Sequence, residues 1–331
     1  MQIVVLGAGA IGSLYAAKLA GTNEVTLVGQ PDHVGAIQEH GLRVEGVEAW
    51  TVRVRATTHL ADLQPDTLIL LTTKVPGTVS ALQPLLPLIR DDTTIVALQN
   101  GIGSEQVARA AIQSRAVVLR GITQFGATFD RPGVVRYMAA GYTIIEDHER
   151  SSRIAAALND AGLECRISSD MTTEVWRKVI FNCVVNPITT IIASEVGAIV
   201  DSHLTRLKQL VIDECVAVAR AEGIRLDEDF MGEINAAYVG SQNIVSMRQD
   251  LLRGRQTEID YLNGAVAELG ARHGVDCPVN EALTRIIKGM EAASRNNRGG
   301  PRLPPPQELP TKIISRAGVR APEINSSEII R

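Results

Sequence analysis

Residues 2–12 read Gln2-Ile3-Val4-Val5-Leu6-Gly7-Ala8-Gly9-Ala10-Ile11-Gly12, and this stretch decides the fold of the N-terminal part of the chain. Its first five residues form an apolar run rich in β-branched side chains, which is typical of a strand buried on both faces. Glycines follow, residues 13–20 have helical character, and a second apolar run occupies residues 24–28. Strand, glycine turn, helix and strand in this order predict a βαβ unit.

The glycine loop has the spacing G-x-G-x-x-G, in which each glycine has its own physical reason. Gly7 permits the tight turn, Gly9 lets the backbone approach a pyrophosphate, and Gly12 allows the helix to pack close to the strand. The N-terminus of that helix offers unpaired N–H groups and the positive end of a dipole to phosphates. We therefore predict a dinucleotide cofactor here; the alternative is a glycine-rich turn without a ligand. The predicted cofactor contacts in this loop are Gly7, Ala8, Gly9, Ala10, Ile11 and Gly12.

Alternating strands and helices continue to about residue 168. Further short strands are predicted at 67–71, 94–98 and 116–123. Such alternation favours an α/β fold with a Rossmann-like, doubly wound parallel sheet. The remaining predicted elements are a hairpin formed by 133–138 and 142–146, a helix at 151–161 and a last strand at 164–167.

From about residue 172 the strand-like runs give way to long amphipathic segments. Residues 205–222 place apolar side chains at a helical spacing, at Leu207, Leu210, Val211, Cys215 and Val218. Residues 258–271 and 280–293 behave similarly. We predict a dinucleotide-binding domain at 1–168, a mostly α-helical substrate and catalytic domain at 169–295, and a Pro- and Gly-rich tail at 296–331. The tail is either disordered or packed over the body or a partner subunit.

The composition narrows the class of protein. The formal net charge of −4 provides no basic face for nucleic acid. The most apolar long segment, residues 179–193, is interrupted by polar residues and a proline, and it is shorter than the ~20 residues of a membrane span. The four cysteines form no C-x-x-C pair, so buried free thiols are expected rather than disulfides or a metal site. No signal peptide precedes the first strand, so we expect a cytoplasmic protein without membrane or nucleic-acid partners.

In dinucleotide-binding folds, the residues after the second strand contact the adenosine ribose and decide between NAD and NADP. An acid there holds the 2′-hydroxyl of NAD, and an Arg there accommodates the 2′-phosphate of NADP. This chain has Gln30, which is neither; Asp32 comes late, and His33 could face a phosphate. These residues alone leave NAD and NADP both open, with Gln30 as the expected cofactor contact.

Two polar residues follow predicted parallel strands, whose carboxyl ends face the ligand crevice of such a sheet. Lys74 follows the strand at 67–71, and it could meet cofactor or substrate, or be a solvated loop lysine. Asn100 follows the strand at 94–98, and it could bind cofactor or substrate, or belong to an Asn-Gly turn. Both are therefore candidate site residues.

A polar stripe lies in the apolar segment 174–187. Lys178, Asn182 and Asn186 are four residues apart and share one face of a helix. Polar groups in so apolar a helix are costly unless they meet a partner or line a cavity. Partial burial also lowers the pKa of a lysine, which suits it to proton transfer near neutrality. The alternative is a surface stripe on an otherwise buried helix.

A second polar segment, residues 242–250, leads into residues 254–264. Thr257 or Glu258 is expected to begin a helix there. Glu258 is a candidate for the site, although an acid in a first helical turn also serves the helix dipole.

Taken together, these segments resemble the ketopantoate reductases (2-dehydropantoate 2-reductases) over residues 1–295. The order and spacing of the matching segments are more specific than any one of them. The matching residues are Gly7 to Gly12, Lys74, Asn100-Gly101, Trp176-Arg177-Lys178, Asn182, Asn186-Pro187, Ser246-Met247 and Thr257 to Gly264. The resemblance implies reduction of 2-dehydropantoate to pantoate with NADPH, a step toward pantothenate and coenzyme A.

The resemblance also implies roles for individual residues. Lys178 looks like the catalytic general acid, and Glu258 looks like the acid that orders the closed site and contacts the cofactor ribose. The implied substrate ligands are Asn100, Lys178, Asn182, Asn186 and Ser246. The implied cofactor contacts outside the glycine loop are Lys74, Asn100 and Glu258, in addition to Gln30, which is expected from its place after the second strand.

Two departures from the family pattern affect the details. Gln30 stands where the family often has an Arg for the NADP phosphate, so the resemblance favours NADPH while NADH stays open. Val196 stands where the family commonly has a substrate-binding Asn, which leaves a related 2-oxo or 3-hydroxy acid as an alternative substrate. A cofactor-binding regulator without turnover is the other alternative, and it would not need the polar stripe. The helical domain could support a homodimer.

Overall fold

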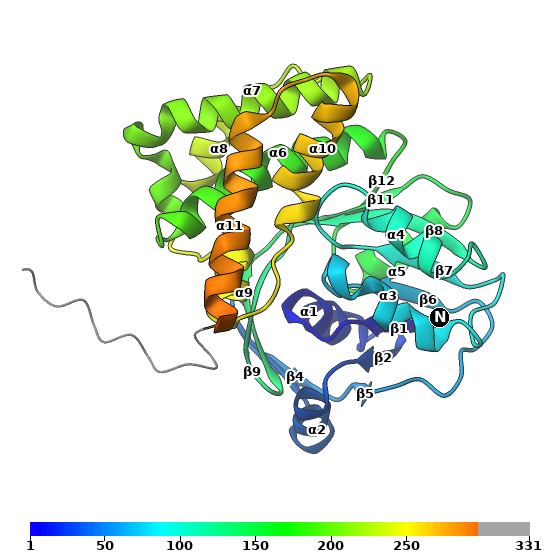
Figure 1. Ribbon diagram of the computed structural model, residues 1–331. Coiled ribbons are helices and arrows are strands. Elements are labelled where there is room, and N and C mark those ends of the chain that lie inside the picture. The colour runs from blue at the N-terminus through cyan, green and yellow to red at the C-terminus, as the bar shows by residue number, and fades with distance from the viewer. Residues whose placement is uncertain (297–331) are drawn as a thin grey trace, which may run out of the picture.

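The computed structural model describes residues 1–296. Figure 1 shows two regions, namely strands with flanking helices up to residue 168 and a group of helices from residue 171 onward. The predicted α/β class, with a Rossmann-like sheet followed by helices, is confirmed. Of the predicted tail at 296–331, everything past residue 296 lies outside the described residues.

The main sheet has eight strands in the order β12-β11-β8-β7-β6-β1-β2-β5. Their bounds are β1 (Gln2–Leu6), β2 (Glu24–Val28), β5 (Arg55–Thr57), β6 (Leu68–Leu71), β7 (Thr94–Ala97), β8 (Val117–Thr123), β11 (Thr143–Glu146) and β12 (Cys165–Ser168). All neighbours pair in parallel except β11, which is antiparallel to β8. Because β1 pairs with β2 on one side and β6 on the other, the strand order reverses beside it. The carboxyl end of β1 is therefore the switch point at which doubly wound sheets bind ligands.

Side chains of β1 alternate between the two faces of the sheet, as expected for a strand covered on both sides. Ile3 and Val5 pack into the core cluster that includes residues of α1 and α5, whereas Val4 and Leu6 pack into the cluster that includes residues of α3 and α4. The helices of this region are α1 (Ala10–Leu19), α2 (Pro31–His40), α3 (Thr78–Leu82), α4 (Ser104–Ala111) and α5 (Ser151–Asp160), with 3-10 turns at Val75–Gly77 and Gln83–Leu85. Both faces of the main sheet are therefore covered.

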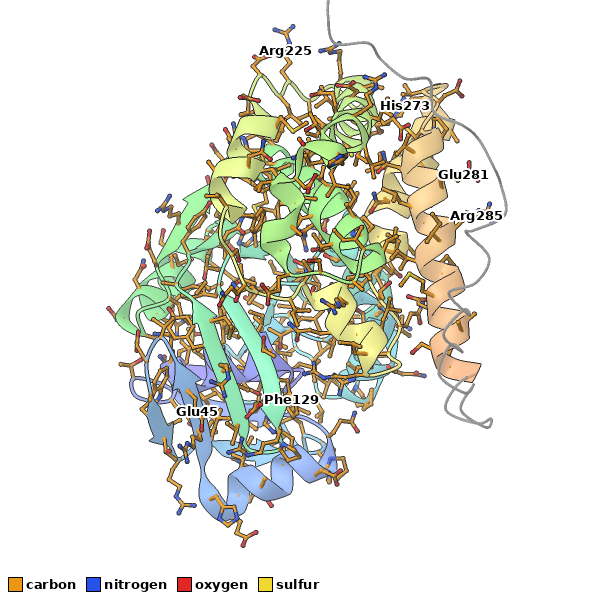
Figure 2. The ribbon with its side chains drawn as sticks, turned by 90° about the vertical axis from the view of Figure 1, so that its left-hand side faces the viewer. Glu45, Phe129, Arg225, His273, Glu281 and Arg285 are labelled. Carbon is orange, nitrogen blue, oxygen red and sulfur yellow. The ribbon has the colours of Figure 1, made fainter. Side chains whose placement is uncertain are left out.

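A second sheet of four strands has the order β4-β3-β10-β9. Its strands are β3 (Leu42–Gly46), β4 (Trp50–Val52), β9 (Gly126–Arg131) and β10 (Val134–Ala139). Figure 2 shows Glu45 of β3 and Phe129 of β9 at the end of the molecule opposite to Arg225 and His273. Its strands β3, β9 and β10 pack against α1, which in turn packs against β1 and β2 of the main sheet.

The predicted hairpin between residues 133–138 and 142–146 is wrong. β10 pairs instead with β9 across the two-residue turn Pro132-Gly133, and β11 joins the main sheet between β8 and β12. So short a turn favours a residue with positive φ, which Gly133 supplies at φ +79°. Residues 126–131 have no clear apolar alternation, so the sequence pattern did not reveal β9.

Six helices occupy residues 171–296. They are α6 (Met171–Ile191), α7 (Thr205–Ala221), α8 (Phe230–Tyr238), α9 (Ser246–Leu252), α10 (Asn263–His273) and α11 (Pro278–Asn296), with 3-10 turns at Val196–Val200, Ser202–Leu204 and Ile259–Tyr261. The helices predicted at 205–222 and 280–293 are confirmed as α7 and part of α11. The helix predicted from 258 is corrected, because residues 259–261 form only a 3-10 turn and α10 begins at Asn263.

α6 carries Pro187 in its interior, where a proline removes a backbone donor. The carbonyl of Cys183, four residues earlier, accepts a hydrogen bond from Asn263 Nδ2 at 3.0 Å instead. Asn263 is fully buried, and its amide also donates to Asn280 Oδ1 at 2.9 Å. A side chain at the start of α10 therefore replaces the hydrogen bond that α6 lacks.

All four cysteines are buried free thiols, as their spacing predicts. Within the described chain, no helix combines the length and the apolarity needed to cross a bilayer. Among residues 1–296, no group of three or more His, Cys, Asp or Glu side chains is arranged to hold a metal ion.

Candidate active site

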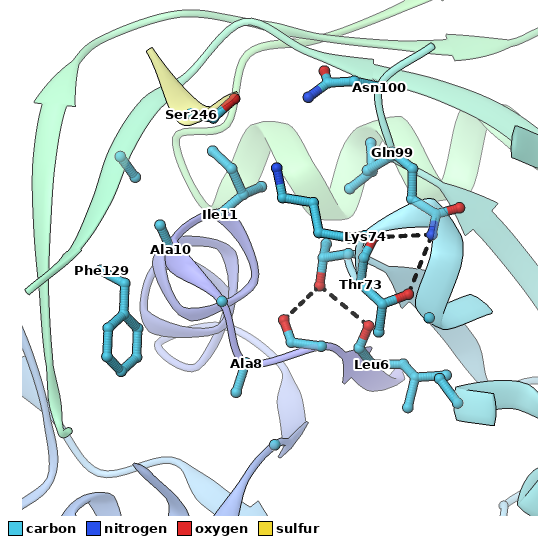
Figure 3. Close-up of a pocket in the computed structure, with 18 of the residues that line it drawn as sticks. Leu6, Ala8, Ala10, Ile11, Thr73, Lys74, Gln99, Asn100, Phe129 and Ser246 are labelled. Carbon is cyan, nitrogen blue, oxygen red and sulfur yellow. Dashed lines mark hydrogen bonds between the residues drawn. The ribbon is translucent and has the colours of Figure 1, made fainter. Parts of the chain in front are cut away.

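A cavity of about 950 Å³ lies where the carboxyl ends of β1, β6 and β7 face α6 and α9. Figure 3 shows Lys74, Asn100 and Ser246 around the space next to Ala10 and Ile11. The predicted site residues that line the cavity are Gly7, Ala8, Gly9, Ala10, Ile11, Gln30, Lys74, Asn100, Lys178, Ser246 and Glu258. Both regions of the chain contribute, so neither forms this cavity alone.

The glycine loop has the geometry that a pyrophosphate site needs. Gly7 has φ +120°, and a Cβ on it would lie 2.5 Å from the Thr73 nitrogen. Gly12 lies behind the loop, where a Cβ would be 2.0 Å from the carbonyl oxygen of Gly7. Gly9 has open space at its Cβ position and lines the cavity at the N-terminus of α1. The first and third glycines are thus required by the protein's own packing, while the second leaves room for a ligand.

Lys74 joins the main sheet to the helical region through two buried carboxylates. Its Nζ lies 3.0 Å from Asp250 Oδ2 and 3.2 Å from Glu258 Oε2. Glu258 Oε2 also accepts a hydrogen bond from Asn100 Nδ2 at 3.1 Å. Burial lowers the pKa of Lys74, but the two carboxylates outweigh that effect and raise it above its ordinary value. Lys74 therefore stays charged and orders Glu258 and Asn100.

Asp250 was not predicted as a site residue, although it lines the cavity. Burial raises the pKa of its carboxyl group, and the adjacent Lys74 opposes that rise. The signal in the sequence is weak, because Asp250 is one acid in the polar segment 242–250 and its partner lies far away along the chain. The side chain of Glu258 makes no capping hydrogen bond to the 3-10 turn that follows it. Its carboxylate points to Lys74 and Asn100 instead.

Lys178 lies on α6 and reaches the same cavity. Its Nζ donates a hydrogen bond to the backbone oxygen of Thr123 at 2.6 Å. Burial lowers the pKa of Lys178 to about 7, the positive charges of Arg120 and Lys74 act in the same direction, and Glu258 opposes them. Of the two cavity lysines, this is the one that can exchange a proton near neutral pH.

Arg120 is a buried residue that the sequence analysis missed. It lies within β8, and its guanidinium donates to the carbonyl oxygens of Gln99 at 2.7 Å and Gly101 at 2.9 Å. These bonds hold the loop that carries Asn100 at the cavity. The sequence does contain a signal for this residue, because an arginine interrupts the apolar run 117–123. A buried guanidinium needs acceptors for several N–H donors, so its neighbours must include polar groups.

The polar stripe of α6 only partly reaches the cavity. Lys178 lines it, whereas Asn182 and Asn186 do not. Asn186 is 8% exposed, and the buried Nδ2 of Asn182 has no hydrogen-bond partner within residues 1–296. Of the three residues of the stripe, the structure therefore brings only Lys178 to the cavity.

Helix α9 connects the helical region to the second sheet at the rim of the cavity. Ser246 begins this helix and lines the cavity. One turn later, Gln249 Nε2 lies 3.4 Å from Thr128 Oγ1. Arg253, which directly follows the helix, donates to the carbonyl of Phe129 at 2.6 Å. Strand β9 thus fixes the position from which Ser246 faces the cavity.

At the other end of the cavity, Gln30 precedes the first turn of α2. His33 lies just beyond it, and its ring does not present a free nitrogen to a phosphate. Nε2 is 3.0 Å from Ser13 Oγ, and Nδ1 accepts a hydrogen bond from the Gly133 N–H at 2.8 Å. Burial lowers the pKa of His33 to about 4. His33 is therefore a neutral structural residue near neutral pH, which corrects the expectation that it could face a phosphate.

The arrangement combines two chemical capacities in one cavity. The glycine loop and the N-terminus of α1 can hold a pyrophosphate. Lys178, with its pKa near neutrality, can give a proton to a carbonyl oxygen or take one from a hydroxyl group. Hydride transfer between a dinucleotide and an oxo acid needs both.

Known proteins resemble this chain over most of its length. Residues 3–150 match the family described as "Ketopantoate reductase PanE/ApbA", and residues 170–291 match "Ketopantoate reductase PanE/ApbA C terminal". A 2-dehydropantoate 2-reductase of Pyrococcus abyssi is 35% identical over 300 residues, which cover 88% of this chain and 98% of the relative.

Two solved structures share the fold. A PanE/ApbA family ketopantoate reductase from Ralstonia eutropha JMP134 has a TM-score of 0.81 and 30% identity, over 89% of this chain and 100% of that chain. A ternary structure of D-mandelate dehydrogenase with NADH and anilino(oxo)acetate has a TM-score of 0.82 and 27% identity, with the same coverage. The matches in sequence and in structure span both regions that build the cavity. The chain therefore belongs to the ketopantoate reductase PanE/ApbA family of oxidoreductases.

Proposed function

We propose that this chain reduces 2-dehydropantoate to (R)-pantoate by hydride transfer from a reduced nicotinamide cofactor, in pantothenate and coenzyme A biosynthesis. The observation that carries the proposal is Lys178, a lysine with a pKa of about 7 that faces the same cavity as the glycine loop. The 35% identical relative named 2-dehydropantoate 2-reductase supports this substrate.

In the proposed reaction the chain positions two reactants and supplies a proton. The bound cofactor contributes the hydride that reaches the ketone carbon. As negative charge develops on the ketone oxygen, Lys178 Nζ stabilises it and donates its proton, a contribution typically of about 10²–10⁴-fold. The carbonyl of Thr123 accepts from Nζ at 2.6 Å and fixes where the proton is presented.

The substrate ligands are assigned from the resemblance and from their places in the cavity. Asn100 and Ser246 line it and can donate to the substrate carboxylate. Asn182 and Asn186 do not line it, so we propose that they contact substrate only when the cleft closes. Glu258 holds Asn100 in place and, by the resemblance, contacts the cofactor ribose.

A second candidate substrate is a 2-oxo acid with a larger apolar side chain. Val196 replaces the family's substrate-binding Asn, and it is 4% exposed. Its N–H donates to the carbonyl of Asn243 at 2.8 Å, and Asn243 lines the cavity. The replacement removes one polar substrate ligand of the family, and the D-mandelate dehydrogenase relative supports this alternative.

Steady-state assays with 2-dehydropantoate and phenylglyoxylate, each with NADH and NADPH, test the proposal. We expect the higher kcat/KM with 2-dehydropantoate. Lys178→Ala should lower kcat by about 10²–10⁴-fold with cofactor affinity unchanged, while Lys288→Ala, at a half-exposed ion pair with Asp260, should match the wild type. A preference for phenylglyoxylate selects the second candidate, and cofactor binding without turnover of either acid contradicts the enzymatic proposal.

Several finer predictions accompany the proposal. The family resemblance alone favours NADPH as the donor, whereas the D-mandelate dehydrogenase relative was solved with NADH. We also propose a domain boundary between residues 168 and 169, a cytoplasmic location and a homodimer. Size-exclusion chromatography with light scattering tests the last of these.

A further inference from the structure

The end of the cavity around Gln30 bears on which reduced nicotinamide the chain uses. We propose that the chain binds NADH in preference to NADPH, because the described residues around Gln30 supply no cation for a 2′-phosphate. The inference rests on the proposed function, in that it concerns the cofactor of the same cavity. It departs from the donor that the family resemblance favours.

Gln30 occupies the position that faces the adenosine ribose in a doubly wound fold. β2 ends at Val28, and the Gly29 N–H donates to the carbonyl of Thr57 at 3.0 Å, at the end of the neighbouring β5. A Cβ on Gly29 would lie 2.3 Å from the Ala8 side chain, so the glycine loop is in close contact with this turn. The residue that follows the second strand contacts the ribose hydroxyls or the 2′-phosphate.

The Gln30 side chain is available to a ligand. It is exposed, it lines the cavity, and it makes no capping hydrogen bond to α2. Its amide offers both donors and an acceptor, which suit two neutral ribose hydroxyls. It brings no charge to offset a phosphate, and Asp32, two residues on in the first turn of α2, adds a negative one.

The ionisable residues next to Gln30 do not replace a missing arginine. His33 is neutral, and Ser13 and Gly133 occupy both of its ring nitrogens. His59 lines the same end, with Nδ1 hydrogen-bonded to Thr58 Oγ1 at 3.2 Å. Neither imidazole offers the forked, permanently charged donors of an arginine.

Three of the four Lys and Arg side chains that line the cavity are hydrogen-bonded or ion-paired, and the fourth, Arg255, is exposed. Lys178 bonds to a backbone carbonyl, and Lys74 is paired with two carboxylates. Arg253 donates to the carbonyl of Phe129. Arg255 lies close enough to Asp250 to lower that group's pKa, at the Lys74 end. A 2′-phosphate beside Gln30 would therefore lose water without gaining a charged partner, which is costly.

Isothermal titration of the purified full chain with NADH and with NADPH at about pH 8 tests the inference without substrate. We expect NADH to bind at least about tenfold more tightly, as for the loss of a charge-assisted hydrogen bond. Gln30→Arg should raise NADPH affinity by a similar factor. Gln209→Arg adds the same charge on α7, away from the cavity, and should leave both affinities unchanged.

The outcomes separate this inference from the proposed function. Equal affinities, tighter binding of NADPH, or no gain of NADPH affinity in Gln30→Arg would overturn the NADH preference while leaving a reductase intact. Binding of neither cofactor would overturn both. NADH preference in binding and in kcat/KM, reversed or reduced by Gln30→Arg, would establish Gln30 as the residue that selects the cofactor.

Discussion

Reduction of the oxo acid should slow as the pH rises through about 7, because Lys178 must carry a proton in order to donate one. Burial and the charges of Arg120 and Lys74 bring its pKa to about 7, against the opposing charge of Glu258. With that pKa, the protonated fraction is ~90% at pH 6 and ~10% at pH 8, with a further fall of about tenfold per pH unit. The forward rate of the hydride step should follow this fraction.

Oxidation of the hydroxy acid tests the same group with the opposite sign. In that direction the amine must be unprotonated in order to accept the hydroxyl proton. Its rate should therefore be low at acid pH, rise through about pH 7 and reach a plateau under alkaline conditions. Two profiles that cross near one pH would tie both directions to a single titrating group.

Stopped-flow single-turnover measurements, which follow reduced-nicotinamide absorbance, isolate the hydride step from product release. Lys178→Arg keeps the positive charge but does not titrate in this range, so its residual rate should be flat with pH. Lys288→Arg serves as the matched control and should keep the wild-type profile. A wild-type forward rate that is constant from about pH 6 to about pH 9, or an unchanged profile in Lys178→Arg, would refute the role of Lys178 as proton donor.

Three substitutions test other parts of the site. Gly9→Ala should fold with wild-type stability, because the added methyl group meets no protein atom within 4 Å. It should bind cofactor at least about tenfold more weakly, because that methyl group lies where a pyrophosphate must approach. Unchanged cofactor affinity by calorimetry would contradict this. Gly12→Ala should lower the free energy of unfolding by about 1–3 kcal/mol, since its Cβ would lie 2.0 Å from the Gly7 carbonyl, and a wild-type denaturation midpoint would count against the described packing. Asp250→Asn removes one partner of Lys74 and should cost about 1–3 kcal/mol in urea unfolding together with a lower kcat; an unchanged midpoint and kcat would show that the pair has no role.

The parts of the site that the sequence predicts are those with short-range signals. The glycine loop is a contiguous motif, and Lys74 and Asn100 follow strands whose carboxyl ends must meet at one edge of a parallel sheet. Lys178 stands out because a charged residue interrupts an apolar helix. Each of these arguments needs only a neighbouring element, so each could be made before the fold was known.

The parts that the sequence does not predict depend on contacts between distant residues. Asp250 matters because it meets Lys74, and Arg120 matters because it holds the loop around Asn100. Neither partner can be inferred from spacing along the chain. The pairing of β10 was mispredicted for a related reason, since local turn chemistry at Gly133 and a weakly patterned β9 decide it.

The hydrogen bond from Asn263 to the Cys183 carbonyl makes two distant positions depend on each other during evolution. With Pro187 in place, the loss of the Asn263 amide would leave a buried acceptor without its donor in the middle of α6. If residue 187 were first to regain an N–H, the same loss would no longer leave the Cys183 carbonyl without a donor. A change at residue 187 that restores the N–H is therefore expected to precede the loss of Asn263. Lineages that keep the proline are expected to keep the asparagine with it.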